Sequence, residues 1–158
     1  MARSSAILER FGALRHYTVY GIVGIPAKPS LAGVENRLQI VFLTDKRGRE
    51  LLRRSLKKKP GDARTKAERA LTVLERSTWQ EAVESKLVSQ LGKPDDTWVY
   101  EIQIGGKPAH RIAVLPGRVG DEQCLLVGEM VTRETLNNKH DKDAFMKRAL
   151  EAADRWRE

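Results

Sequence analysis

The sequence predicts an α+β fold built on a small, mainly antiparallel sheet. Three short apolar segments, residues 98–104, 110–115 and 124–131, follow one another, and each is separated from the next by a turn. A helical pattern over residues 141–157 closes the chain. One further strand and a helical hairpin precede these segments. Helices that come before a run of consecutive strands are typical of α+β folds and not of doubly wound α/β sheets.

The first 36 residues are predicted to form an extension, and residues 37–158 a single main domain. Within the extension, residues 6–14 have apolar side chains at helical spacing, and residues 17–23 are rich in branched and aromatic side chains. Residues 26–33 contain the Pro and Gly typical of a loop. We therefore expect a short helix, an extended segment and a Pro-rich linker.

The main domain begins with a predicted strand over residues 37–44, where branched and aromatic residues predominate. Nearly every position is apolar, so we expect this strand to be central in the sheet. Residues 46–74 predict a helical hairpin, with Pro60-Gly61 at the break and Asp62 available for capping. A third helix is expected over residues 77–91, because Ser77 or Thr78 begins a capping box that ends at Glu81.

The composition favours a globular protein that binds a polyanion. The 158 residues are 41% hydrophobic and 32% charged, and the net charge is +8. No apolar run reaches the roughly 18 residues of a membrane span, and Glu9 and Arg10 interrupt any signal-peptide core, so we expect a cytoplasmic protein without membrane partners. The single cysteine, Cys124, lies in an apolar segment and is expected to be a small core residue.

Much of the positive charge lies in the predicted helical hairpin. Between residues 46 and 69 eleven cations face only three carboxylates: Lys46, Arg47, Arg49, Arg53, Arg54, Lys57, Lys58, Lys59, Arg64, Lys66 and Arg69 against Glu50, Asp62 and Glu68. Like charges at this density repel one another unless a ligand neutralises them. A solvated helix face remains the alternative for any one residue. For the whole cluster we expect polyanion binding.

The segments Val99-Tyr100-Glu101-Ile102, His110-Arg111-Ile112-Ala113-Val114 and the final Ala149–Arg155 helix, together with the order of the elements, resemble the RelE/HigB superfamily. Its members are bacterial and phage-borne toxins of type II toxin–antitoxin systems. The resemblance covers residues 37–156. It implies a RelE-like fold and a cytoplasmic endoribonuclease that cleaves mRNA, in many members on the ribosome, and inhibits translation. It also implies a cognate antitoxin, expected to be a helix-turn-helix protein.

The resemblance further implies a site. Attack of a ribose 2′-hydroxyl on phosphorus needs cations for the phosphate, a base and an acid. Arg111 would hold the phosphate with Arg133 beside it, and His140 would act as acid in the turn before the last helix. Glu101 or Glu129 would act as base, with orientation of Arg111 as the alternative role of Glu101. This role requires the guanidinium of Arg111 to face open solvent. RNA-binding candidates are Lys139, Lys107, Arg53, Arg54, Lys57 and Lys58.

Two features support a non-catalytic alternative on the same fold. Gln103 stands where several members have a basic side chain, and Thr132 and Met130 replace a basic and an aromatic residue. Under this alternative, Arg111 is a structural arginine paired with Glu101 across a hairpin, while the module binds nucleic acid or an acidic protein. His110 is expected on the sheet face opposite Arg111, as a surface residue. No His/Cys cluster has zinc spacing and no Gly-rich phosphate loop occurs, so neither metal nor cofactor is predicted.

Overall fold

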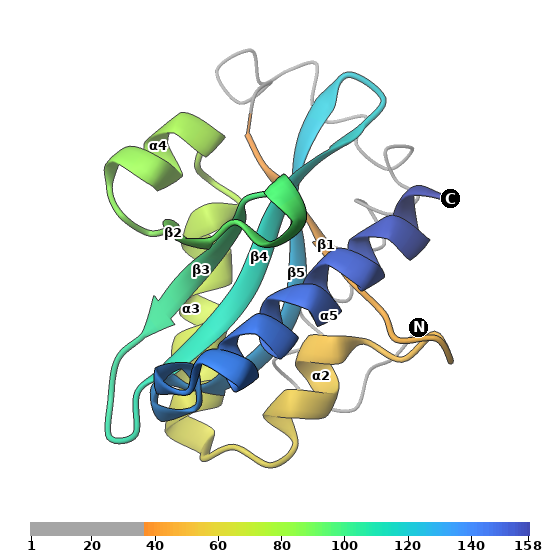
Figure 1. The fold of residues 1–158 in the computed structure, drawn as a ribbon. Helices are drawn as coiled ribbons and strands as arrows, with labels where there is room; N and C mark the ends of the chain where they lie inside the picture. Colours follow the sequence, from red (N-terminus) through yellow and green to blue (C-terminus); the bar gives the residue numbers. More distant parts are fainter. Residues whose placement is uncertain (1–36) are drawn as a thin grey trace.

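The computed structural model describes residues 37–158, in which a five-stranded mixed sheet is covered by helices on both faces (Figure 1). The strand order is β1-β5-β4-β3-β2. Four α-helices lie in this part of the chain, in the expected α+β arrangement. The residues of the predicted extension, 1–36, including its helix, extended segment and linker, lie outside the described residues.

Strand β1 (Gln39–Phe42) runs parallel to β5, with Ile40 opposite Leu125. The prediction of a central strand is wrong, because β1 is the last strand of the sheet on that side within residues 37–158. All four of its residues are nevertheless buried. Ile40 packs on one face of the sheet and Val41 on the other, and both faces are covered by helices. A strand buried on both faces is apolar at nearly every position, whatever its place in the sheet.

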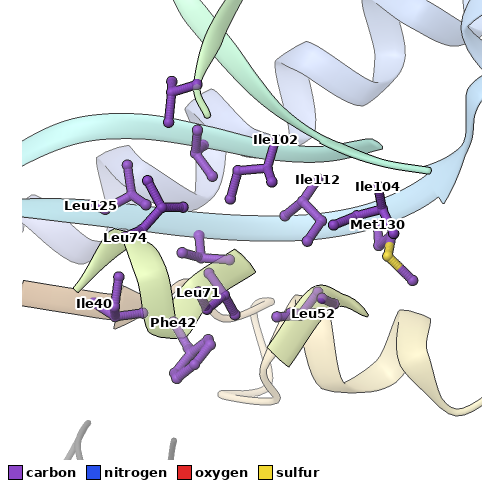
Figure 2. Packing of buried hydrophobic residues seen from close by; sticks show 14 of the residues in the cluster. Ile40, Phe42, Leu52, Leu71, Leu74, Ile102, Ile104, Ile112, Leu125 and Met130 are labelled. Carbon is purple, nitrogen blue, oxygen red and sulfur yellow. The ribbon is translucent and has the colours of Figure 1, made fainter. Parts of the chain in front are cut away.

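The predicted helical hairpin is confirmed as α2 (Leu51–Leu56) and α3 (Gly61–Leu74). Pro60 is the N-cap residue of α3, and Asp62 lies in the first turn without a side-chain capping bond. Leu52, Leu71 and Leu74 are fully buried against one face of the sheet, where they meet Ile102, Ile112 and Leu125 (Figure 2). Burial of each such side chain stabilises the fold by about 1.5–3 kcal/mol.

The single helix predicted over residues 77–91 is instead a short helix and a strand. Helix α4 (Trp79–Glu84) begins with the expected capping box, in which Thr78 accepts from the Glu81 amide and the Glu81 carboxylate accepts from the Thr78 amide. The chain then turns at Lys86, which has a φ of 63°. Strand β2 (Ser89–Gly92) follows and pairs antiparallel with β3.

The three consecutive strands are confirmed as β3 (Val99–Ile104), β4 (His110–Val119) and β5 (Glu122–Thr132), paired antiparallel. Between β4 and β5 the register shifts, because Ile112 pairs with Met130 and Val114 with Val127. Two residues of β5, one of them Gly128, therefore stand opposite a single residue of β4, which is a β-bulge.

The opposite face of the sheet is covered by α5 (Lys139–Arg157), the predicted C-terminal helix (Figure 1). Phe145, Ala149 and Ala153 of this helix pack against Ala113 and Leu126. Cys124 is buried in the same cluster, and this burial raises the pKa of its thiol to about 12, as expected of a core cysteine. Among residues 37–158, no helix has both the length and the apolar character needed to cross a membrane.

Candidate functional site

The α5 side of the sheet holds a polar cluster of Glu101, Gln103 and Arg111. Glu101 pairs with Ala113 and Gln103 pairs with Arg111 across β3 and β4, and Ala113 packs against α5. Since residues two apart on a strand share a face, all three polar side chains point to the α5 side. The Arg111 Nε lies 3.6 Å from the Glu101 Oε2, and the Gln103 Nε2 donates to that same oxygen at 3.1 Å.

Arg111 does not face open solvent. Only 12% of its side chain is exposed, and 11% of that of Glu101. Its Nη1 also donates to the backbone carbonyl of His110 at 2.9 Å. The expectation of a freely exposed guanidinium is therefore wrong, because the predicted alternative contact with Glu101 across the hairpin is present. The pair is nevertheless long for a charge-assisted hydrogen bond, for which about 2.7–2.9 Å is usual.

Arg133 and Lys107 lie at the same end of the sheet as Arg111. Arg111 stands opposite Val131 on β5, and Arg133 follows two residues later. The Arg133 amide donates to the Ala109 carbonyl at 2.8 Å, which extends the pairing of the two strands by one step. Lys107 lies in the exposed turn between β3 and β4, two residues before Ala109. Both cations are exposed, so both are accessible to a ligand.

Lys139 and His140 are brought to this end by the start of α5. A short 3₁₀ helix (Arg133–Asn137) leads from β5 directly into α5, whose first turn is capped by Asn138. His140 therefore lies inside the helix, in its first turn, and not in the turn before it as predicted. Lys139 and Lys142 line an open groove of about 390 Å³, together with Gly92 of β2. Gly92 pairs with Val99, two residues before Glu101 on β3, and none of the three polar-cluster residues lines the groove.

The basic helical hairpin reaches the same end of the molecule through its turn. The Lys66 Nζ donates to the carbonyl of Gly105, at the tip of the β3–β4 hairpin, at 3.2 Å. Figure 1 shows the α2–α3 turn, this hairpin and the start of α5 at one end of the sheet. Lys57 and Lys58 lie in the turn and are exposed. Their charges therefore add to those of the sheet end.

Arg53 and Arg54 are placed differently from the two lysines. The Arg54 Nη1 forms an ion pair with Asp45 at 2.9 Å. Hydrogen bonds from Arg49, above all from its backbone amide, lower the pKa of Asp45 to about 2, so Asp45 stays charged near neutral pH. Arg53 is half-buried on α2. Of the four predicted hairpin residues, Lys57, Lys58 and Arg54 are exposed, and Arg54 is already paired with Asp45.

His110 was predicted to be a surface residue, and this is wrong. The side chain does point away from Arg111, but it is only 1% exposed. It lies on the face that carries Ile112, Met130 and the α2–α3 hairpin. Its Nδ1 is buried without a hydrogen-bond partner in the described part of the chain. Burial and the nearby charge of Lys59 lower its pKa. The alternation along β4 predicted the sheet face on which His110 lies but not the element that covers that face.

No group of three or more His, Cys, Asp or Glu side chains among residues 37–158 is arranged to hold a metal ion. The site offers cations, the exposed imidazole of His140 and the carboxylates of Glu101 and Asp143. No protein-family model, curated protein or solved structure matches this chain.

Proposed function

We propose that the protein is an RNA-binding endoribonuclease of the toxin type, acting on mRNA at the end of the sheet described above. The observation that carries the proposal is a convergence. Arg111, Arg133, Lys139 and His140 were singled out from the sequence, and they come from β4, the end of β5 and the start of α5 at one end of the sheet. Arg111 and His140 are 29 positions apart in the sequence, and both lie at this end of the sheet.

The chemistry supports a phosphate ligand at this end. A guanidinium pairs two phosphate oxygens with its rigid fork and remains charged throughout. Arg111 is held in place by β4 and by its bond to the His110 carbonyl, and a preorganised cation is more effective than a mobile one at stabilising a developing negative charge. His140, exposed at the helix start, would donate a proton to the leaving oxygen. Glu101 would accept the proton of the 2′-hydroxyl.

The surrounding cations support a polymeric substrate. Lys57, Lys58, Lys107 and Lys139 are exposed at the same end of the sheet, and each would neutralise one phosphate of a strand that runs along it. The partners under this proposal are mRNA, the ribosome and a cognate helix-turn-helix antitoxin. A cytoplasmic location is part of the same proposal.

A second function has one observation in its favour, namely that Arg111 and Glu101 are paired and nearly covered. An arginine committed to such a contact is typical of a structural role. The protein would then bind RNA through its basic end without cutting it. This alternative predicts salt-sensitive binding and intact RNA.

Induced expression in a bacterial host separates the two functions. We expect growth arrest and cleaved messages with the wild-type chain, and neither with Arg111→Ala. Arg118→Ala is the matched control, since Arg118 is an exposed arginine near the other end of the same strand, and it should remain toxic. A folded Arg111→Ala variant, verified by thermal melting, that still arrests growth would overturn the proposed site.

A further inference from the structure

The proposed function does not account for one feature of the polar cluster on β3 and β4. The carboxylate of Glu101 is already paired with the guanidinium of Arg111. The Glu101 Oε2 lies 3.6 Å from the Arg111 Nε and accepts from the Gln103 Nε2 at 3.1 Å. A carboxylate and a phosphate oxygen present the same kind of acceptor to an arginine. Glu101 therefore stands where an anionic ligand of Arg111 would stand.

We infer that Glu101, positioned by Gln103, is an internal competitor of the RNA phosphate for Arg111, so that the site is closed until a phosphodiester displaces it. This inference rests on the proposed function. Arg111 is the binding residue, and Gln103 is a positioning residue that acts only through Glu101. Displacement frees the carboxylate beside the bound phosphate, which is where a base for the 2′-hydroxyl is needed.

The geometry favours a contact that can be exchanged. At 3.6 Å the two charged groups attract each other without the short hydrogen bond that would fix them. The second anchor of Arg111, the bond from its Nη1 to the His110 carbonyl, involves a different nitrogen and need not break. Gln103 itself is exposed, so an incoming strand reaches the cluster from the side on which Gln103 lies.

The neighbourhood also favours an anion as the displacing group. An open groove at the start of α5 is lined by Lys139 and Lys142, with Asp143 as its one carboxylate. The two lysines would compensate the charge of a phosphate that enters this groove while Glu101 moves away from Arg111.

The test uses the full chain and compares Glu101→Gln with Glu129→Gln. Glu129 is the matched control, because it is a half-buried strand carboxylate that pairs with another arginine, Arg148. Both substitutions add the same unit of net charge. Two quantities are measured, namely the rate at which phenylglyoxal modifies Arg111, followed by mass spectrometry, and the affinity for a short single-stranded 2′-O-methyl RNA, which cannot be cleaved.

We expect Glu101→Gln to raise both the reactivity of Arg111 and the affinity for RNA by about fivefold, the upper end of what the loss of one ion pair gives, and Glu129→Gln to raise neither to that extent. Gln103→Leu keeps the ion pair and removes its hydrogen-bonding support, so it should give a smaller gain in both. This exposed substitution also provides a second variant should Glu101→Gln fold poorly.

The outcomes distinguish this inference from the proposed function. An Arg111 that is no more reactive in Glu101→Gln than in the wild-type chain overturns the inference, whatever the RNA affinity. A rise in reactivity without a gain in affinity supports the covering role of Glu101 and overturns the assignment of Arg111 to RNA. Equal gains in Glu101→Gln and Glu129→Gln indicate net charge alone and overturn the inference.

Discussion

The Lys66 Nζ on α3 lies 3.2 Å from the backbone carbonyl oxygen of Gly105, at the tip of the β3–β4 hairpin. Lys66 also pairs with Asp62 at 3.2 Å, one turn earlier on the same helix. This contact joins two segments that are 39 positions apart in the sequence. It places the lysines of the α2–α3 turn and Lys107 of the hairpin at one end of the molecule, which is the basis of the proposed RNA surface.

Charge reversal at this end should weaken RNA binding much more than the same reversal elsewhere. We expect the double variant Lys57→Glu, Lys58→Glu to bind single-stranded RNA about tenfold more weakly or worse, and the slope of log affinity against log salt to fall by about 1 or more, as phosphate contacts are lost. Fluorescence anisotropy over a range of salt concentrations measures both quantities.

The control for this experiment is the double variant Lys46→Glu, Arg47→Glu. Both residues are exposed in the turn between β1 and α2, which Figure 1 shows on the side of the molecule away from the β3–β4 hairpin. Net charge changes equally in the two double variants. Equal losses of affinity would mean that binding depends on total charge and not on this surface.

The stability of the fold should decrease in acid because of His110. Burial and then the charge of Lys59 lower the pKa of His110 from its usual 6.5, so the folded state holds it neutral. Below about pH 6.5 the unfolded chain takes up a proton that the folded chain does not, and unfolding becomes easier as the pH falls. Above this pH the contribution of His110 to stability is complete.

Thermal melting between pH 7.5 and 5 measures this effect. We expect His110→Leu, which fits an apolar site of similar size, to make the melting temperature less dependent on pH over that range. His140→Gln is the control, since His140 is exposed, and its curve should follow that of the wild-type chain. If the His110→Leu curve also followed the wild type, the buried imidazole would not be the source of the acid sensitivity.

Gly128, in the bulge of β5, packs closely against β4 and α5. A Cβ added there would lie 3.3 Å from the backbone oxygen of Ala113 and 3.7 Å from the Cβ of Ala149 on α5. We expect Gly128→Ala to lower the free energy of unfolding by about 1–2 kcal/mol through overpacking, as measured by urea denaturation. Gly105→Ala is the matched control, because a Cβ at Gly105 meets nothing within 4 Å. Equal losses in both variants would contradict the close packing of α5 on the bulge.

Local signals in the sequence predicted those elements that local interactions determine. The Pro60-Gly61 break set the helical hairpin, and the capping box at Thr78 and Glu81 set the start of α4. The end of α4 and the strand β2 were missed. Residues 89–92 are a strand because they pair with β3, and a helical pattern read along residues 77–91 contains no information about that partner.

The sequence predicted which residues belong to the site better than it predicted how they are arranged. Strand alternation correctly separated Arg111 from His110, because it depends only on the period of the strand. The burial of His110 and the shielding of Arg111 depend on what lies over each face. The α2–α3 hairpin covers the sheet face on which His110 lies, and Glu101 shields Arg111 on the opposite face. These are tertiary contacts between distant segments, which one sequence does not specify.

The most direct test of the central claim is the chemistry of the RNA ends. Attack of a 2′-hydroxyl on the neighbouring phosphorus leaves a 2′,3′-cyclic phosphate on one fragment and a 5′-hydroxyl on the other. Purified protein is incubated with mRNA and ribosomes, and the ends are sequenced after ligation that selects for cyclic phosphate. We predict such ends with the wild-type chain and with Arg118→Ala, and their loss with Arg111→Ala. Intact mRNA with the wild-type chain, bound but uncut, would contradict the nuclease account and favour the binding module.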